Sequence, residues 1–113
     1  MHELSIIQNI IEIAKKEAVA RNSKRVEEIV IEVGELTGIN TEFLKFSFDT
    51  TRDKAMFENC ILTILPVQGQ MQCLNCGNRF ETNSFLCSCP LCNKNENVVI
   101  KGKELIIKSL LLE

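Results

Sequence analysis

Four cysteines in two closely spaced pairs have the clearest chemistry in this chain. The pairs are Cys73 with Cys76 and Cys89 with Cys92, each with the spacing C-x-x-C. A C-x-x-C turn presents two thiolates from one bend, so two such turns supply the four soft ligands of a tetrahedral metal site. Gly77 and Pro90 are residues that favour these tight bends. The spacing predicts a structural zinc site, because four protein ligands leave no coordination position for a substrate.

Two features of this site stay open at the level of sequence. Cys87 lies close to Cys89 and could take its place as a ligand. Iron competes with zinc, because paired C-x-x-C turns also hold a single iron in small redox proteins. A redox motif would need one cysteine pair, whereas this chain has two, so a redox or disulfide role is disfavoured. Cys60 stands apart in an apolar run, and we expect it to pack as a small buried hydrophobe.

The N-terminal tripeptide Met1-His2-Glu3 offers a second set of metal donors. His2 is the only histidine of the chain. The Met1 amine, the His2 backbone nitrogen and the His2 imidazole would close two fused chelate rings, and Glu3 could add a fourth donor through its backbone nitrogen or its carboxylate. Four such donors in a plane suit Ni(II) or Cu(II). The alternative is a surface histidine near a frayed terminus that binds nothing.

The elements that must position these groups show helical and strand patterns in turn. Apolar residues at helical spacing predict a helix over residues 4–22. Alternating apolar residues predict a strand over residues 25–33, which Gly34 ends. We expect a second helix from a cap at Asn40 or Thr41 to about Asp53. Further strands are predicted at residues 60–68, 97–101 and 104–112.

Together these elements predict an α+β fold with two helices on a three-stranded mixed sheet. The cysteine pairs fall between the last two strands of that sheet, so the metal-binding segment reads as an insertion. We therefore expect a discontinuous main domain of residues 1–69 plus 104–113, and an inserted four-cysteine β domain that resembles a zinc ribbon at residues 70–103. The inserted segment has few large apolar residues, so its folding should depend on the metal.

Composition excludes several classes of function. The chain has 113 residues and a net charge of −2, which argues against a nucleic-acid partner held through phosphates. With one histidine and no Gly-rich phosphate loop, the sequence shows no catalytic constellation, so we do not expect an enzyme. No basic leader precedes an apolar core, and no apolar run is long enough to span a membrane. Six cysteines at these spacings indicate a reducing cytoplasm, and we expect a monomer or a weak dimer.

Three motifs are spread along the chain: Met1-His2-Glu3-Leu4-Ser5, Val33-Gly34-Glu35-Leu36, and the two cysteine pairs before a closing strand. Together they resemble the HypA/HybF family of hydrogenase maturation proteins over nearly the full length. The resemblance implies a small α/β nickel domain with an inserted zinc domain. It also implies delivery of Ni2+ to the [NiFe] hydrogenase large subunit, which could extend to urease, and a GTPase partner of the HypB type.

Carried over to this chain, the resemblance assigns two sets of ligands. Nickel would be bound by Met1, His2 and Glu3, and Zn2+ by Cys73, Cys76, Cys89 and Cys92. Some relatives carry histidines near their zinc cysteines and this chain carries none, so nothing in the sequence supports a role of the zinc loop in handling nickel. The alternative function is a zinc-ribbon module that binds a protein or a nucleic acid and has no nickel function.

Overall fold

A computed structural model describes residues 3–113 of the chain. The chain forms two compact units. Unit 1 comprises Met1–Ile31, Ile39–Leu65 and Ile106–Glu113, and unit 2 comprises Glu32–Gly38 and Pro66–Leu105. The assignment of residues 1–69 plus 104–113 as a nickel domain and of 70–103 as a zinc domain stays a prediction.

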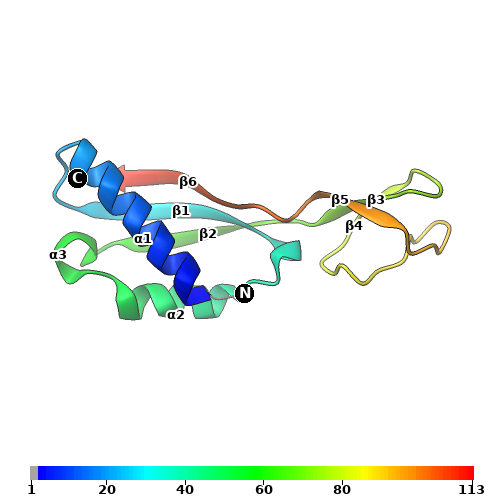
Figure 1. The fold of residues 1–113 in the computed structure, drawn as a ribbon, viewed down its shortest axis with the longest axis horizontal. Coiled ribbons are helices and arrows are strands. Elements are labelled where there is room, and N and C mark those ends of the chain that lie inside the picture. The colour runs from blue at the N-terminus through cyan, green and yellow to red at the C-terminus, as the bar shows by residue number, and fades with distance from the viewer. Residues whose placement is uncertain (1–2) are drawn as a thin grey trace. The chain divides into compact units, whose positions relative to one another are not determined.

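Unit 1 combines helices with one three-stranded sheet, so the predicted α+β fold class is confirmed. The sheet has the order β2-β1-β6, with the strands β1 (Val26–Gly34), β2 (Ile61–Val67) and β6 (Leu105–Leu112). Glu113 N donates to Arg25 O at 3.1 Å, as expected where β6 runs antiparallel to β1, whereas β2 runs parallel to β1 (Figure 1). The sheet is therefore mixed, as expected.

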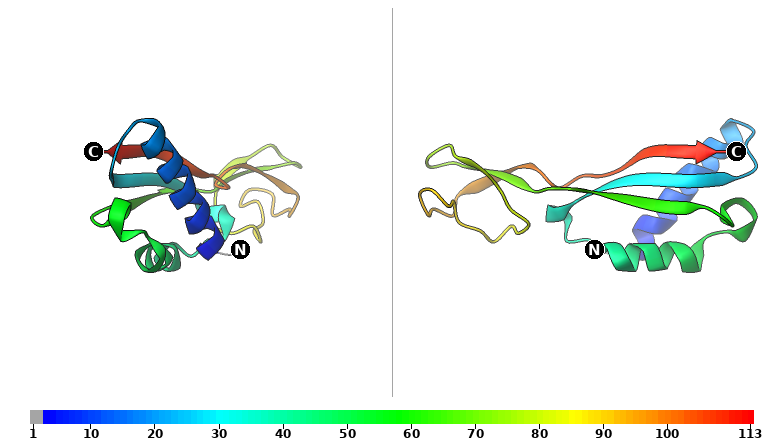
Figure 2. Two further views of the ribbon diagram at one scale, coloured as in Figure 1. Left: turned by 60° about the vertical axis from the view of Figure 1, so that its left-hand side comes forward. Right: turned by 180° about the vertical axis from the view of Figure 1, so that it is seen from behind.

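Three helices accompany this sheet: α1 (Glu3–Ala20), α2 (Thr41–Thr51) and the short α3 (Lys54–Phe57). The first two confirm the predicted helices to within two residues at each end, whereas α3 was not predicted. Helix α1 lies across the strands of the sheet (Figures 1 and 2). Its buried face carries Ala14 and Ala18, which have no exposed surface, and such small side chains allow a helix to approach its neighbours closely.

Side chains on α2 and α3 determine where these helices begin. Asn40 is the N-cap of α2, because its Oδ1 accepts from Phe43 N at 3.0 Å. Asp53 caps α3 by accepting from Ala55 N at 2.7 Å, and it pairs with Lys15 at 3.3 Å. The hydrogen bond from the Ala55 N–H, with help from Lys15, holds the pKa of the Asp53 carboxyl below its usual value. These caps satisfy N–H groups that a helix cannot bond internally.

The core of unit 1 closes around the aromatic residues of α2 and α3. Phe48 and Phe57 are almost fully buried and meet edge to face, with ring centroids 6.4 Å apart. Cys60 beside them is 4% exposed, which confirms the prediction that it packs as a buried hydrophobe. Burial raises the pKa of its thiol to about 11, so Cys60 is neutral at physiological pH.

Unit 2 is built on a smaller antiparallel sheet of order β4-β3-β5. Its strands are β3 (Gln70–Cys73), β4 (Arg79–Glu81) and β5 (Asn97–Lys101). Strand β5 coincides with the predicted strand at residues 97–101, whereas β3 and β4 were not predicted. Met71, at the centre of this sheet, pairs with Phe80 and Val99 and is only 3% exposed. Few large side chains share this core, as expected for a metal-dependent segment.

The Val33-Gly34-Glu35-Leu36 motif belongs to unit 2. Gly34 N donates to Glu104 O at 2.7 Å, and Leu36 N donates to Gly102 O at 2.8 Å. A Cβ on Gly34 would lie 1.9 Å from Gly102 O, so only glycine allows this approach. Leu36 is 2% exposed and packs against the glycines Gly69 and Gly102. The motif is therefore an anchor for the segment Glu32–Gly38 within unit 2.

None of the helices described in residues 3–113 combines the length and apolar character that crossing a membrane requires.

Candidate metal centre

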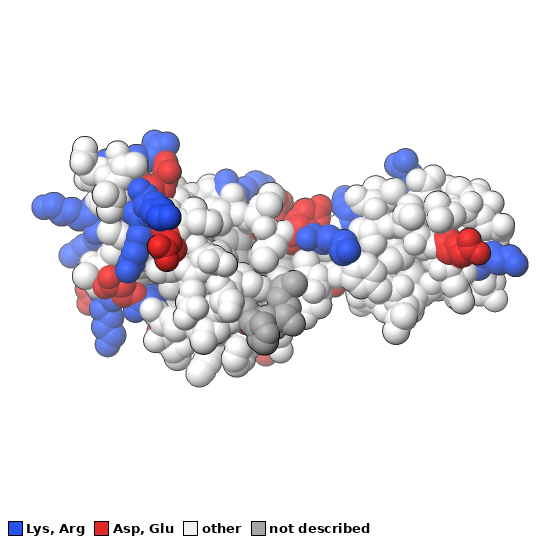
Figure 3. All heavy atoms as spheres, viewed as in Figure 1, with Lys and Arg blue, Asp and Glu red and all other residues white. Residues whose placement is uncertain are grey.

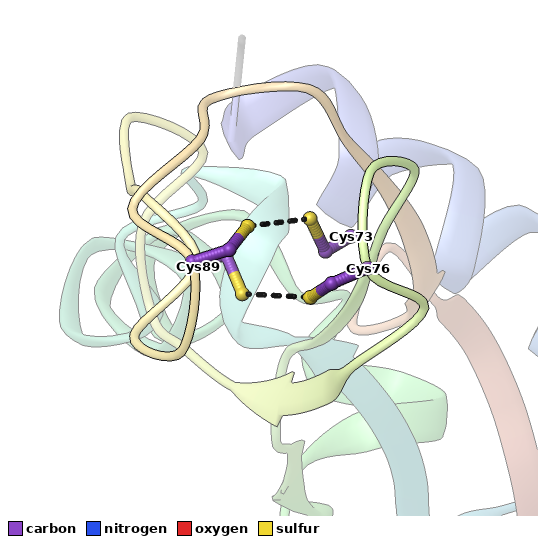
Figure 4. A group of neighbouring side chains, drawn as sticks. Cys73, Cys76 and Cys89 are labelled. Atoms are coloured by element: carbon purple, nitrogen blue, oxygen red, sulfur yellow. Dashed lines mark hydrogen bonds between the residues drawn. The ribbon is translucent and has the colours of Figure 1, made fainter.

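The first cysteine pair forms a knuckle, a tight turn that leads out of β3. Cys73 O accepts from Gly77 N at 2.9 Å, and Cys73 N donates to Asn78 O at 2.8 Å. Gly77 has φ of +78°, in the left-handed region that glycine adopts at low cost. The turn therefore returns the chain directly after Cys76 and leaves both thiols on its inner side (Figure 4).

The second cysteine pair repeats this backbone geometry. Cys89 O accepts from Asn93 N and Cys89 N donates to Lys94 O, both at 2.8 Å. Asn93 takes the place of the glycine with φ of +65°, a conformation that asparagine tolerates better than most residues. Both C-x-x-C pairs thus fold into equivalent knuckles.

The two knuckles face each other through their sulfur atoms. Sγ of Cys73 lies 3.5 Å from Sγ of Cys92, and Sγ of Cys76 lies 3.6 Å from Sγ of Cys89 (Figure 4). All four sulfurs lie within 4.8 Å of one another. With a Zn–S bond of about 2.3 Å, the edges of a tetrahedron measure about 3.8 Å. The cluster therefore has the donor type and the dimensions that a tetrahedral Zn2+ requires.

Hydrogen-bond donors around the sulfurs favour thiolates on the second knuckle. Burial raises the pKa of Cys89, but the N–H groups of Cys92 and Leu91 and the side chain of Asn78 outweigh it and bring the pKa to about 6. The Asn78 Nδ2 to Cys89 Sγ distance is 3.7 Å. The N–H of Lys94 is the largest of the effects that lower the pKa of Cys92.

The pKa of Cys76 is shifted in the opposite direction, upward. The N–H of Asn78 lowers its pKa, but burial and the neighbouring sulfurs of Cys89, Cys92 and Cys73 outweigh it and raise the pKa to about 12. A thiolate is the form that binds metal. Since one ionised sulfur opposes the ionisation of the next, a cation at the centre is needed before all four can be thiolates.

Cys87 lies outside this cluster. Its Sγ donates to Met71 Sδ at 3.4 Å, and its carbonyl oxygen accepts from Asn97 Nδ2 at 3.1 Å. Of the two ligand sets left open by the sequence, the structure brings together the symmetric one, Cys73, Cys76, Cys89 and Cys92. The identity of the metal and the role of these cysteines as its ligands remain predictions.

Two residues that the sequence did not single out contribute to this site. Asn78 points its amide at a cluster sulfur, and Asn93 supplies the left-handed turn of the second knuckle. Each asparagine follows its cysteine pair within two residues. Their positions after the pairs were the available signal, because asparagine tolerates left-handed backbone and offers an N–H donor on a short side chain.

The surface of unit 2 is poor in charge. Residues 82–93 contain no acidic or basic side chain. In Figure 3, uncharged residues form most of the visible surface around β3 and β5. Leu74 and Leu91, in the middle of the two knuckles, are 63% and 74% exposed, and Leu86 is 95% exposed. A phosphate-binding surface would need basic side chains here, so this face does not favour nucleic acid.

Only part of the predicted nickel site lies within the described residues. Met1 and His2 lie outside them. Glu3 is the first residue of α1, and its Oε2 accepts from Asn40 N at 3.2 Å. This bond ties the residue that follows His2 to the N-cap of α2.

Comparison with known proteins identifies the family. The family model described as "Hydrogenase/urease nickel incorporation, metallochaperone, hypA" matches residues 1–112. The chain belongs to the HypA family. This confirms the resemblance seen in the sequence motifs.

Relatives and solved structures extend the match over the full chain. Hydrogenase maturation factor HypA of Caldanaerobacter subterraneus is 38% identical over 115 residues and covers 100% of both chains. Its counterpart from Francisella philomiragia is 36% identical and covers 97% of both chains. The solution structure of the Ni metallochaperone HypA from Helicobacter pylori matches with a TM-score of 0.67 at 23% identity, covering 99% of this chain and 97% of that one. A further HypA solution structure has a TM-score of 0.71 at 23% identity and covers 100% and 97%. These two structures support the HypA fold.

Proposed function

We propose that this protein is a nickel metallochaperone that binds one Ni(II) at its N-terminus and delivers it during [NiFe] hydrogenase maturation. The observation that carries the proposal is the sequence Met1-His2-Glu3 at the start of a chain that matches the nickel-incorporation family model over residues 1–112. His2 is also the one imidazole available to a nickel ion. In this proposal nickel is the cargo.

The donor set follows from the chemistry of the tripeptide. The Met1 amine, the His2 amide nitrogen and the His2 imidazole form a five-membered and a six-membered chelate ring around one ion. Nitrogen donors in a plane suit Ni(II). The amine and the imidazole bind only when deprotonated, and their reference pKa values are about 7.7–8.0 and about 6.5. Nickel affinity should therefore fall as the pH is lowered through this range.

We assign the fourth donor to the backbone nitrogen of Glu3. Its carboxylate already accepts a hydrogen bond from Asn40 N, which nickel ligation would have to disturb. Glu3 is the first residue of α1, and its backbone nitrogen directly follows the His2 residue that supplies the imidazole.

Zinc has a structural role in this proposal. Cys73, Cys76, Cys89 and Cys92 would hold it, since their sulfurs have the spacing and softness for a tetrahedral Zn2+. Bound zinc supplies charge that lets all four sulfurs ionise together. Because the knuckles have few apolar contacts of their own, the free energy of zinc binding is what stabilises the folded form of unit 2.

The partners follow from the proposed task. The recipient is the large subunit of a [NiFe] hydrogenase, with urease as a further recipient, and a GTPase of the HypB type takes part in the transfer. The protein acts in the cytoplasm and is a carrier that performs no catalysis. The alternative is a zinc-ribbon module that binds a protein without nickel, and the exposed leucines Leu74, Leu86 and Leu91 favour it over nucleic-acid binding.

Nickel calorimetry on the zinc-loaded protein, with four N-terminal variants, tests the proposal. One added residue before Met1 moves the free amine and should abolish tight binding. Glu3→Gln keeps the backbone nitrogen and a side-chain acceptor for Asn40, so it should bind nearly as tightly as the original chain. Glu3→Pro fits the first position of a helix but lacks the N–H, so it should bind more weakly and change the visible spectrum of the bound nickel. Glu3→Ala is the control for loss of the side chain alone.

Three results would contradict the proposal or its donor set. Unchanged affinity in the extended chain would mean that nickel binds without the Met1 amine. Equal affinity and identical spectra for Glu3→Pro and Glu3→Gln would remove the backbone nitrogen of Glu3 from the donor set. A protein without any nickel affinity, but with zinc bound, would leave the protein-binding module as the function.

A further inference from the structure

Two sulfur atoms outside the four-cysteine cluster lie in direct contact within unit 2. Sγ of Cys87 is 3.4 Å from Sδ of Met71. A thioether carries no hydrogen on its sulfur, so the Cys87 thiol is the donor and its S–H bond points at a lone pair of Met71. Both sulfurs therefore direct soft electron pairs at the same short gap.

Separate segments of unit 2 hold the two sulfurs in place. Met71 lies in β3, where it pairs with Phe80 and Val99 and is only 3% exposed. Cys87 belongs to the segment that leads into the second knuckle, and its carbonyl oxygen accepts from Asn97 Nδ2 on β5 at 3.1 Å. The tertiary structure therefore creates this sulfur pair, whose members are 16 positions apart in the chain.

The amide that positions Cys87 also carries an unused acceptor. Asn97 Oδ1 is buried and has no hydrogen-bond partner within the part of the chain that the structure describes. Buried polar atoms are normally satisfied, and an exception of this kind points to a bound ion or a water. Since Oδ1 and Nδ2 belong to one amide group, this acceptor lies close to the Cys87 backbone. A ligand in this neighbourhood would account for it.

A groove on the surface of unit 2 gives access to this place. It has a volume of about 370 Å³, and its uncharged lining consists of Phe85, Leu86, Cys87, Ser88 and Asn95. Cys87 is half-buried and is the one sulfur-bearing residue in this lining, whereas Met71, which its thiol contacts, is buried. An ion that enters the groove therefore meets the thiol before the thioether.

The two donors select a soft ion with a single charge. Thiolate and thioether sulfurs favour Cu(I), whereas carboxylate and carbonyl oxygens suit Mg2+ and Ca2+. One Cu(I), one thiolate and one thioether have no net charge together, and residues 82–93 supply no carboxylate to balance a second positive charge. A Zn2+ ion would also require four ligands.

The distance between the sulfurs is compatible with such an ion after a small movement. With metal–sulfur bonds of about 2.3 Å, as for Zn–S, a linear arrangement separates the two sulfurs by about 4.6 Å. The observed 3.4 Å would have to increase by about 1 Å. Methionine is unbranched and has three rotatable bonds, so the Met71 side chain can make this adjustment.

We infer that Cys87 and Met71 form a Cu(I) site, separate from the four-cysteine cluster and from the N-terminal nickel donors. The thiol of Cys87 gives its proton to water as the Cu(I)–sulfur bond forms, and the oxidation state of copper does not change. The site goes beyond the proposed nickel function and does not depend on it.

Methyl NMR with Cu(I) on the zinc-loaded full chain tests this site. The chain has three methionines, Met1, Met56 and Met71, whose methyl groups can be labelled with carbon-13. Cu(I) is supplied without oxygen from a competing chelator, up to one equivalent. The Met71 methyl signal should shift while those of Met1 and Met56 stay in place. Metal analysis should find one copper and one zinc per chain, because copper binds outside the cluster.

Two substitutions remove one donor each. Met71→Leu conserves the volume of a core residue, and Cys87→Ser replaces the thiol by a hydroxyl. Each should weaken Cu(I) binding by about 100-fold or more, since changes to residues that only support metal ligands already cost about 10–100-fold. Met56→Leu removes a thioether from α3 in unit 1 and is the matched control, which should bind Cu(I) like the wild type.

Four outcomes would overturn the inference. Release of one zinc for each copper bound would place Cu(I) in the cluster. A Met71 methyl signal that does not move when copper is bound would exclude the thioether as a ligand, and so would unchanged affinity in Met71→Leu. A wild-type chain that takes no Cu(I) from the chelator, or takes it no better than Cys87→Ser, would have no such site. Circular dichroism and zinc content show that each variant is folded.

Discussion

Replacing one cysteine at a time should separate the zinc ligands from Cys87. Cys89 has no exposed surface, and its Sγ lies 3.6 Å from Sγ of Cys76 within the cluster. We expect Cys89→Ser to lose zinc, because a hydroxyl is a harder and poorer ligand for Zn2+ than a thiolate. Cys87→Ser should keep one zinc per chain, because it removes a sulfur that contacts Met71 and no cluster sulfur.

The zinc-binding free energy that Cys89→Ser is expected to lose exceeds what the other contacts of unit 2 can offset. Structural zinc contributes about 10–16 kcal/mol of apparent binding free energy in zinc-finger peptides at neutral pH, which is comparable to the whole stability of a domain. The buried apolar residues described in unit 2 are Val33, Leu36, Met71, Cys73 and Cys89, and two of these are cluster cysteines. Unit 2 should therefore unfold without zinc. Cys87→Ser should cost no more than about 1.5 kcal/mol, the upper range for one typical intramolecular hydrogen bond.

Zinc analysis combined with hydrogen exchange measures both effects. The α-helices α1, α2 and α3 all belong to unit 1, so the helical circular dichroism of Cys89→Ser should persist. Amide protection in residues 66–105 should be lost in the same variant. A full zinc equivalent and native protection in Cys89→Ser, with zinc loss in Cys87→Ser instead, would refute the assignment of Cys89 as a ligand.

Three further predictions concern the scaffold. Gly102→Ala should destabilise unit 2 more than Gly38→Ala does. Both glycines have positive φ, but a Cβ on Gly102 would also lie 2.6 Å from Gly69 Cα. The Gly38 change alone should cost about 1–2 kcal/mol in urea denaturation. Asn40→Ala should cost about 1 kcal/mol in thermal denaturation and Asn40→Asp much less, since aspartate also caps a helix. Burial raises the pKa of Cys60 from 9.0 to about 11, so its contribution to stability is complete below pH 9 and lost as the pH approaches 11. Cys60→Ala should lack that alkaline loss in denaturation curves, and an equal loss in both proteins would contradict the assignment.

Local patterns in the sequence were enough to predict most of unit 1. The apolar spacing that includes Ala14 and Ala18 predicted α1, because one face of a helix must be buried. A cap predicted at Asn40 or Thr41 indicated where α2 begins, and the structure assigns this cap to Asn40. The C-x-x-C spacing predicted the cluster, because each knuckle is a local turn.

Features that depend on distant contacts were not predictable in this way. Leu36 belongs to unit 2 because Gly69 and Gly102 leave room for it, and these residues are far apart in the chain. Strand β3 was missed because its four residues are too few to show a period. The sequence also could not decide between Cys87 and Cys89, since the difference lies in how the second knuckle turns at Asn93.

Nickel titration of His2→Ala against the unmodified chain tests the central claim most directly. Both proteins should be zinc-loaded, begin at Met1 and be measured by calorimetry at one pH near neutrality. We predict that the unmodified chain binds one Ni(II) tightly and that His2→Ala does not, while zinc content and helical signal stay the same. Equal nickel affinity in the two proteins would place the ion elsewhere, with the cysteines as the next donors to examine, and would contradict the N-terminal metallochaperone mechanism.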